Sequence, residues 1–135
     1  MDMITKDIWI GSFNDAQDVS SLRETGIQSV LCLDGCLLGK SAEEIGVKQI
    51  EVVPLIDGRG NRPEVFLRAV GTLKQLIAKH APVLVHCHAG QSRSAAVVCK
   101  FFMKEEGNSL AEAMKRISSK RKVAIQAGLQ EALDF

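Results

Sequence analysis

The sequence of 135 residues lacks the features that mark several classes of protein. Its four cysteines, Cys32, Cys36, Cys87 and Cys99, are too few and too scattered for a disulfide scaffold. No apolar run approaches the roughly 20 residues that a bilayer-spanning helix requires. The opening stretch MDMITKDIWIG has acidic residues and no long apolar core, so it is unlike a secretory signal. The formal net charge of +1 gives no overall field that would attract nucleic acid or an anionic membrane.

These absences narrow the protein to one broad class. The sequence shows no internal repeat, low-complexity tract or linker, so we expect a single domain over residues 1–135. The composition, 46% hydrophobic and 24% charged, is that of an ordinary globular protein. We expect this domain to be monomeric and cytoplasmic, where thiols stay reduced, with no nucleic-acid partner and no insertion into a membrane.

Four short segments have the length and composition of β-strands. Residues 29–33 (SVLCL) and 49–53 (QIEVV) are rich in aliphatic and β-branched side chains, and residues 7–11 form an apolar stretch that ends at a glycine. Residues 83–86 (VLVH) are suited to the middle of a sheet because they are almost entirely apolar. The sequence therefore predicts four strands.

Capping residues and the spacing of apolar side chains predict five helices. The signals are a proline in the first turn, a Ser-x-x-Glu capping box and a glycine after the last turn. The helix over residues 94–104 is apolar on nearly every side, so we expect it to be buried. The helices are predicted to start after a cap at Asn14, at Pro63, at Ser94, after the capping box of Ser109 and Glu112, and near Gln126.

The order of these elements, β-α-β-β-α-β-α-α-α, predicts an α/β fold in which a central, mostly parallel, twisted sheet is flanked by helices. The strand of residues 83–86 leads through a run of small residues into the helix of residues 94–104. In open α/β sheets, ligands bind beyond the carboxyl ends of the strands. We therefore expect the functional site in the loop between this strand and this helix.

That loop lies within LVHCHAGQSRSAA, residues 84–96, and has the composition of an anion-binding site. Small residues between a strand and a helix allow consecutive backbone N–H groups to point inward as a nest. The first turn of the helix adds unpaired N–H groups and the positive end of its dipole. Arg93 can return over the nest and bind two oxygens of a tetrahedral anion through its planar guanidinium. The loop therefore predicts a cradle the size of a phosphate group, with Cys87 at its floor.

The same cradle prepares Cys87 for nucleophilic attack. Amide donors, the helix N-terminus and Arg93 all favour the thiolate, which is the reactive form of cysteine. Attack on phosphorus gives a cysteinyl-phosphate, which water then hydrolyses. Ser94 can hydrogen-bond the sulfur and stabilise it as the leaving group of the second step. Asp57, in the Gly-rich segment VPLIDGRGNRP, is the candidate for the acid that protonates the leaving alkoxide and then acts as base on the water, the alternative being an ordinary turn aspartate.

The stretch HCHAGQSRS resembles the HCxxGxxR(S/T) signature of the cysteine-dependent protein tyrosine phosphatase superfamily, in its compact dual-specificity form. The resemblance covers nearly the whole chain: residues 8–33 resemble the family's opening strand, helix and second strand, VPLIDG its general-acid loop, and AEAMKRISSKR its later helix. It implies a dual-specificity phosphatase-like fold with a strand, a CX5R loop and a helix at the active site. It implies phosphorylated proteins or peptides as substrates, with neither a metal nor an organic cofactor.

Matched residue by residue, the resemblance assigns roles in the site. Cys87 is the nucleophile, Asp57 the general acid and Ser94 the residue that stabilises the thiolate, while His86 orients the loop. The phosphate-binding residues are His88, Ala89, Gly90, Gln91, Ser92 and Arg93, the last through its side chain as well. The chain departs from the family in the stretch VAIQAGL, which lacks the usual Asn-Pro and is one residue shorter, and it contains no tyrosine. The tyrosine-bearing loop that deepens the pocket of tyrosine-specific members is therefore missing, which favours a shallow site.

Cys32 and Cys36 leave several interpretations open. The strand that holds Cys32 should neighbour the strand before Cys87, and some family members protect the nucleophile through a disulfide with a nearby second cysteine. Cys32 or Cys36 is thus a candidate redox partner of Cys87, the alternative being ordinary packing in the core or at its rim. A zinc site of Cys32, Cys36, His86 and His88 is a further alternative, but the CxxxC and HxH spacings are not strong zinc signatures, so no metal is expected.

The substrate is less determined than the chemistry. The resemblance favours proteins that carry phosphotyrosine, phosphoserine or phosphothreonine, but an RNA 5′-phosphate, a phosphoglucan, a phospholipid or a small phosphomonoester would use the same chemistry. Phosphoinositide-directed relatives tend to carry lysines inside the loop, and this loop has none. A non-catalytic phosphate-binding module is the remaining alternative. Such modules usually lose the nucleophile or the acid, whereas this chain keeps Cys87, Arg93 and Asp57.

Overall fold

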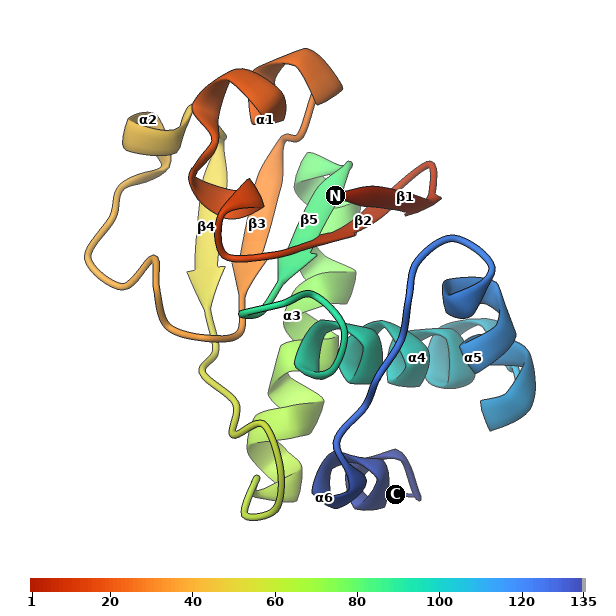
Figure 1. Cartoon of the computed structure of the whole chain (residues 1–135). Coiled ribbons are helices and arrows are strands. Elements are labelled where there is room, and N and C mark those ends of the chain that lie inside the picture. The colour runs from red at the N-terminus through yellow and green to blue at the C-terminus, as the bar shows by residue number, and fades with distance from the viewer. Residues whose placement is uncertain (135) are drawn as a thin grey trace.

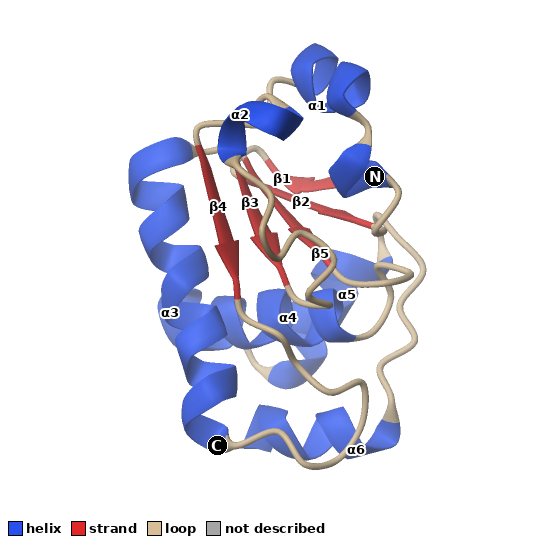
Figure 2. Cartoon of the chain, turned by 90° about the vertical axis from the view of Figure 1, so that its left-hand side faces the viewer, coloured by secondary structure: helices blue, strands red, loops and turns tan. Residues whose placement is uncertain are grey.

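The computed structural model describes residues 1–134 and contains a five-stranded sheet with helices on both faces (Figures 1 and 2). The strands are β1 (Asp2–Thr5), β2 (Ile8–Gly11), β3 (Ser29–Cys32), β4 (Gln49–Val52) and β5 (Val83–His86). They lie in the order β1-β2-β5-β3-β4; β1 and β2 pair antiparallel and the other neighbours pair parallel. The sheet is therefore mostly parallel, as predicted, with β5 at its centre.

Helices cover the two faces of this sheet unequally. The long helices α3 and α4, with α5, lie on one face, and the shorter η1, α1 and α2 cover the other (Figure 2). No helix within residues 1–134 is both long and apolar enough to cross a bilayer. The helices are α1 (Val19–Thr25), α2 (Ala42–Ile45), α3 (Pro63–His80), α4 (Arg93–Glu106), α5 (Leu110–Ser118) and α6 (Ala127–Gln130), with two 3-10 helices, η1 (Asp15–Gln17) and η2 (Glu131–Asp134).

The alternation of side chains along the strands divides the core into two apolar clusters. Leu31 of β3 and Val85 of β5 join the cluster that includes residues of α3, α4 and α5. Their neighbours Val30 and Leu84 belong to the cluster that includes residues of η1, α1 and α2. The central strand β5 is therefore buried on both faces, which explains why its sequence is apolar without interruption up to its last residue.

Several helix predictions are confirmed. Every residue of α4 from 94 to 102 is buried, as its all-round apolar sequence requires. Pro63 occupies the first turn of α3. The capping box before α5 forms, since the Ser109 side chain accepts the Glu112 amide at 3.1 Å and the Glu112 carboxylate accepts the Ser109 amide at 2.7 Å. Gln126 is the N-cap residue of α6.

The N-terminal half differs from the expectation in three places. Residues 2–5 form β1, which completes a tight hairpin with β2; these residues are partly exposed at the sheet edge and lack the length of a clear strand pattern. The cap of α1 is Asp18, whose carboxylate accepts the Ser21 amide at 3.1 Å, so the prediction of Asn14 was wrong. Asn14 precedes η1 and makes no capping hydrogen bond through its side chain. The single turn of α2 was not expected because four residues are too few to show a helical period.

The topology brings two loops to one edge of the sheet. Because β3, β4 and β5 run parallel, the segments that follow them emerge together at their carboxyl ends. The Leu33 amide donates to the His86 carbonyl at 3.0 Å, and the Leu55 amide donates to the Leu33 carbonyl at 2.9 Å. The segment after β4, which contains Asp57, is thereby fastened beside the loop after β5 (Figure 1).

Candidate active site

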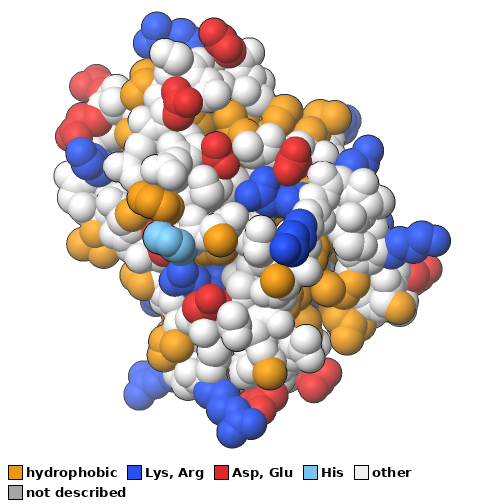
Figure 3. Space-filling model, viewed as in Figure 1, with side chains coloured by type: hydrophobic (Ala, Val, Ile, Leu, Met, Phe, Trp, Pro, Cys, Tyr) orange, Lys and Arg blue, Asp and Glu red, His pale blue; other side chains and the backbone are white. Residues whose placement is uncertain are grey.

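A cavity of about 160 Å³ lies at the carboxyl end of β5. Three segments contribute to it: the loop after β5, the loop after β4, and the segment that follows α5 and runs back to α6 (blue in Figure 1). Charged side chains of both signs are interspersed over this side of the molecule (Figure 3), so any preference for an anion has to arise inside the cavity. The cavity is lined by Asp57, Cys87, His88, Ala89, Gln91, Ser92, Arg93, Ala124 and Gln126.

In the loop after β5, the backbone carbonyls are hydrogen-bonded within the described part of the chain, whereas the backbone amides are not. Each carbonyl from Cys87 to Ser92 accepts a hydrogen bond from a neighbouring group: in chain order these are His86 Nδ1 (3.3 Å), the Phe13 amide (3.0 Å), Arg121 Nη2 (3.1 Å), Arg121 Nε (2.7 Å), the Ala124 amide (2.8 Å) and the Ala96 amide (2.9 Å). By contrast, none of the amides of residues 88–92 donates a hydrogen bond to any group within residues 1–134. The loop therefore offers consecutive amide donors, as the predicted nest requires.

Arg121 holds this loop in place and was not predicted as a site residue. Its guanidinium donates to two loop carbonyls and, through Nη1, to the Asp2 carboxylate at 2.8 Å; the Arg121 side chain is only 14% exposed. It comes from the basic run SSKRK after α5, and such runs are ordinarily solvated, so the pattern itself carries no signal of this role. Arg121 therefore fixes the loop through its carbonyls and leaves the loop amides available to an anion.

Gly90 allows this loop to approach β2 closely. Its φ is +72°, in the left-handed region, and a Cβ atom there would lie 2.5 Å from the Gly11 carbonyl oxygen and 2.6 Å from Arg121 Nη2. Both the backbone conformation and the close approach exclude a side chain. The glycine of the signature is therefore needed for the shape of the cradle.

Cys87 and Arg93 occupy the two ends of the loop, as predicted. Cys87 is 2% exposed, and its sulfur lies 3.3 Å from the hydroxyl oxygen of the buried Ser94. Arg93 Nη1 donates to the Leu55 carbonyl at 3.2 Å, which anchors the guanidinium to the segment after β4. Arg93 Nε is buried and has no hydrogen-bond partner among residues 1–134. The cavity thus contains a thiol and a buried cationic donor that is still unsatisfied.

Asp57 faces the same cavity from the loop after β4. The Ser92 hydroxyl donates to Asp57 Oδ1 at 2.5 Å and accepts the Gln126 amide at 3.0 Å. Ser92 therefore links all three segments that surround the cavity, a function that the signature alone did not predict. Otherwise the loop of Asp57 is fastened mainly to itself, since the Asn61 side chain bonds both the amide and the carbonyl of Ile56 at 2.7 Å.

His86 lies beneath the loop of Cys87, in a cluster with Cys32 at the end of β3 and with Asp34 and Cys36 in the turn that follows β3. His86 is the register partner of Cys32, and the donor atoms of Cys32, Asp34, Cys36 and His86 lie within 4.8 Å of one another. His88 is not part of this group, because its ring stacks on Phe13 with centroids 4.6 Å apart. The strand neighbourhood predicted for Cys32 is confirmed, whereas a disulfide between Cys87 and either cysteine of the cluster stays a prediction; all four cysteines are free.

The four groups of this cluster influence one another's ionisation. Burial lowers the pKa of His86, against the attraction of Asp34, and keeps the imidazole neutral. Burial raises the pKa of the Cys36 thiol to about 12, and its hydrogen bond to Asp34 adds to the effect. Burial also raises the pKa of Cys32. Burial would raise the pKa of Asp34 too, but hydrogen bonds from the Cys36 amide and thiol hold that pKa below its usual value.

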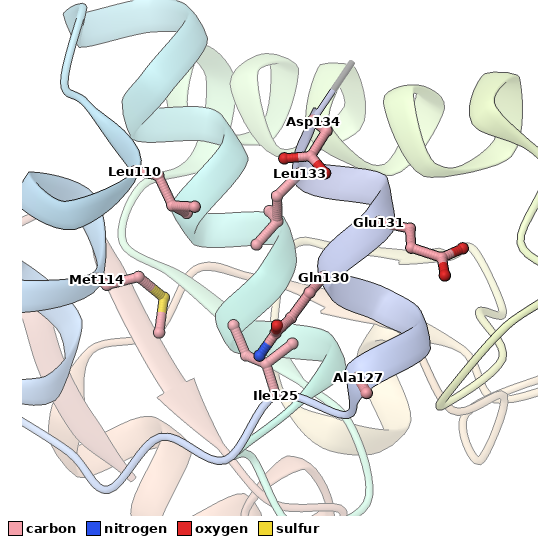
Figure 4. A pocket seen from close by; sticks show the side chains of 8 residues that line it. All are labelled: Leu110, Met114, Ile125, Ala127, Gln130, Glu131, Leu133 and Asp134. Carbon is pink, nitrogen blue, oxygen red and sulfur yellow. The ribbon is translucent and has the colours of Figure 1, made fainter.

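A second cavity, of about 480 Å³, lies on the other side of the segment between α5 and α6 (Figure 4). Ala124 and Gln126 line the cavity at Cys87, whereas the alternate residues Ile125 and Ala127 line this one, so the segment separates the two. The second cavity is larger but contains no cysteine, histidine or basic side chain. Its lining is Leu110, Met114, Ile125, Ala127, Gln130, Glu131, Leu133 and Asp134.

Comparison with known proteins agrees with this geometry. The family model described as "Dual specificity phosphatase, catalytic domain" matches residues 8–133. Dual specificity protein phosphatase 1 of Arabidopsis thaliana is 29% identical over 122 residues, which are 90% of this chain and 61% of that protein. Dual specificity protein phosphatase 1B of the same plant is 30% identical over 118 residues, which are 87% of this chain and 70% of that protein.

Solved structures share the fold. The crystal structure of human DUSP28 superimposes with a TM-score of 0.84 at 22% sequence identity, over 99% of this chain and 93% of that one. The predicted α/β architecture is thereby confirmed. With its family model matched over residues 8–133 and its CX5R loop built around a buried thiol, the chain belongs to the dual specificity phosphatase family of cysteine-dependent hydrolases.

Proposed function

We propose that the chain hydrolyses phosphomonoesters on proteins or peptides, on phosphotyrosine as well as phosphoserine and phosphothreonine, through a cysteinyl-phosphate on Cys87. The observation that carries the proposal is the set of unsatisfied donors around one thiol. The amides of residues 88–92 and Arg93 Nε all lack an acceptor within residues 1–134. A phosphoryl group brings several anionic oxygens, so it satisfies these donors together.

In the first step, the Cys87 thiolate attacks phosphorus and the bond from phosphorus to the ester oxygen breaks. Asp57 gives its proton to the departing oxygen. The loop amides and Arg93 hold the non-bridging oxygens, and donors placed in advance of reaction are each worth about 10²- to 10³-fold in rate. The products of this step are the free alcohol or phenol and a cysteinyl-phosphate.

In the second step, water attacks the phosphorus of the cysteinyl-phosphate. Asp57, now a carboxylate, takes a proton from that water, and the sulfur leaves as a thiolate. Ser94, whose oxygen lies 3.3 Å from the sulfur, donates a hydrogen bond that stabilises the thiolate. Inorganic phosphate is released, and both Cys87 and Asp57 return to their starting protonation states.

Three features support a phosphoprotein substrate. The named relatives are protein phosphatases, the cavity of about 160 Å³ has no tyrosine-bearing wall, and the loop has no lysine for additional phosphates. A shallow site admits both the short phosphoserine and the longer phosphotyrosine side chain. We further propose a single catalytic domain over residues 1–135 that works as a monomer in a reducing compartment such as the cytoplasm.

The test is a comparison of kcat/KM over phosphotyrosine and phosphothreonine peptides, soluble phosphoinositides, a phosphoglucan and an RNA 5′-phosphate. We expect the peptides to have the highest values, and a preference of tenfold or more for any other class would overturn the substrate assignment.

Cys87→Ser should abolish turnover and retain phosphate binding, because the cradle is mostly backbone. Cys99→Ala, which alters a core thiol outside the cavity, is the matched control. Turnover by Cys87→Ser within tenfold of the parent would disprove the mechanism.

A further inference from the structure

We propose that Cys32, Asp34, Cys36 and His86 form a binding site for a thiophilic divalent cation of the zinc type, directly beneath the nucleophile loop. Their donor atoms lie within 4.8 Å of one another, although no two of these four residues are adjacent in sequence. Two sulfurs, one imidazole nitrogen and one carboxylate oxygen are a donor set that suits zinc, whereas calcium and magnesium prefer oxygen alone.

The backbone brings these donors together before any metal binds. Cys32 ends β3 and His86 ends β5, and the two are paired in register. The chain then turns at Gly35, whose φ of +81° is in the left-handed region, and returns Cys36 toward Cys32. The Asp34 carboxylate accepts the Cys32 thiol at 3.4 Å and the Cys36 amide at 2.9 Å, which fixes the turn.

The spacing of the donors is close to what a tetrahedral ion needs. Bonds of about 2.0–2.3 Å to zinc place its ligand atoms about 3.3–3.8 Å apart. The separation of Asp34 Oδ1 from Cys32 Sγ is 3.4 Å and from His86 Nδ1 is 4.0 Å. The amides of Leu37 and Gly35 near the Cys32 sulfur act to lower the pKa of that thiol, against the effect of burial, and so favour the thiolate that binds a metal. The widest separation in the group, within 4.8 Å, exceeds the tetrahedral range by about 1 Å, so side-chain adjustments of about that size would complete the site.

Metal binding at this site changes a contact of the catalytic loop. The two thiols release their protons when they bind the cation, and the neutral imidazole binds through the Nδ1 lone pair with its proton on Nε2. In the metal-free chain Nδ1 lies 3.3 Å from the Cys87 carbonyl oxygen and donates to it. Occupation of the site removes this hydrogen bond from the residue that carries the nucleophile. We therefore infer that the cation lowers phosphatase turnover, a consequence that rests on the proposed function, whereas metal binding does not.

The binding test uses the full chain with Cys87→Ser, so that the catalytic thiol cannot bind metal. Reduced, chelator-treated protein is titrated with Co²⁺ and followed by thiolate-to-cobalt charge-transfer absorption. We expect the absorption to saturate at about one equivalent and to disappear when Zn²⁺ is added. Adding Cys36→Ala should remove it, and adding Cys99→Ala, a thiol outside the cluster, should not. Absence of the absorption in folded Cys87→Ser protein, or its persistence after Cys36→Ala, would overturn the proposal.

A second variant, Asp34→Ala, keeps the proposal testable if Cys36→Ala does not fold. Cys36 is only partly buried, and circular dichroism shows whether Cys36→Ala remains folded. Asp34→Ala in the Cys87→Ser background should weaken Co²⁺ binding at least tenfold, and equal affinity would count against the site. In the catalytically intact chain, Zn²⁺ should lower turnover about 2- to 12-fold, the value of one hydrogen bond, and Cys36→Ala should remove most of this effect. Equal zinc inhibition of both proteins would assign the inhibition to Cys87 and overturn the regulatory inference, while the cobalt result decides the site itself.

Discussion

The two loops that meet at the cavity are held in opposite ways. The loop of Cys87 is buried at its start, and each of its six carbonyls is bonded to a neighbouring element or to Arg121. The loop of Asp57 is exposed at its tip. Beyond Leu55, its links to the rest of the molecule are the hydrogen bond from Ser92, an exposed ion pair between Arg59 and Glu131 at 3.4 Å, and the packing of Arg59 against Gly128. One half of the site is fixed by the fold, and the other is attached to it by few contacts.

This difference suits the mechanism proposed above, in which the loop of Cys87 binds the phosphoryl group and Asp57 transfers protons. Donors that stabilise charge in the transition state act best when they need no rearrangement, so the loop of Cys87 is rigid. An acid that alternates between donating and accepting a proton has to meet both the leaving group and water, so the loop of Asp57 stays accessible. The comparison predicts that changes in the two loops have different kinetic signatures.

The largest effect with a distinct signature is expected for Asp57→Asn. A positioned acid is worth about 10²- to 10⁴-fold, so hydrolysis of phosphopeptides should slow by about that factor. An activated ester such as 2,4-dinitrophenyl phosphate needs little protonation, so its hydrolysis should slow much less. The basic limb of the pH–rate profile should flatten. Equal slowing of both substrates with an unchanged basic limb would assign the acid to another carboxylate, such as Asp34.

Arg93→Lys tests the fixed half. An ammonium cannot replace the two-pronged contact of a guanidinium, and it also loses the anchor to the Leu55 carbonyl. We expect kcat/KM to fall by about 10²- to 10³-fold on every substrate, whatever its leaving group, with weaker inhibition by vanadate. Arg68→Lys, on the exposed side of α3, is the matched control. Near-parental kinetics for Arg93→Lys would show that the residue only begins a helix.

Gly90→Ala tests whether close packing maintains the cradle. The substitution forces a side chain into a left-handed conformation and against the Gly11 carbonyl, so we expect the free energy of unfolding to fall by about 2–4 kcal/mol. Gly107→Ala separates the two causes, because Gly107 has a φ of +70° but nothing within 4 Å of the added Cβ. It should lose only about 1–2 kcal/mol. If urea denaturation gives the two variants the same loss in the free energy of unfolding, the close approach of Gly90 to Gly11 does not contribute to stability.

The smallest effect is expected where the two loops touch. Ser92→Ala removes one hydrogen bond to Asp57, and a hydrogen bond contributes about 0.5–1.5 kcal/mol, so phosphopeptide turnover should fall about 2- to 12-fold. Because the hydroxyl acts through the carboxylate, the same substitution should cost much less in the Asp57→Asn background. A double-mutant cycle measures this coupling. Fully additive losses would show that Ser92 acts on the phosphate instead.

The parts of this protein that the sequence predicts are those that neighbouring residues determine. The apolar strand, the small-residue loop and the all-round apolar helix stand next to one another in residues 83–104, and together they predict β5, the cradle and α4. The capping box at Ser109 likewise lies within one turn. Asp57 was predicted from its place after a strand and from the resemblance of VPLIDG to the family's general-acid loop. These predictions needed no knowledge of distant contacts.

The parts that the sequence does not predict depend on residues far apart in the chain. Arg121 and Gln126 reach the loop of Cys87 only because the segment after α5 returns across it. The contact between Ser92 and Asp57 spans 35 residues. The cluster around Asp34 depends on the register of β3 with β5, which no local pattern specifies. Strand pairing and chain reversal, rather than residue type, decide these contacts.

The hydrogen bond from Arg121 to Asp2 joins residues 119 positions apart. Closing so long a stretch of chain carries an entropic cost, and proteins rich in such non-local contacts fold more slowly. A peptide with only β5, the signature loop and α4 would contain Cys87 and two of the six groups that bond the loop carbonyls, the His86 ring and the Ala96 amide, but would lack Phe13, Arg121 and Ala124, which bond the other four. A partly folded chain, with the segment after α5 detached, would lack the Arg121 and Ala124 contacts that hold the carbonyls of Ala89, Gly90 and Gln91. Under the mechanism proposed above, the cradle around Cys87 is therefore complete only when both ends of the chain have docked.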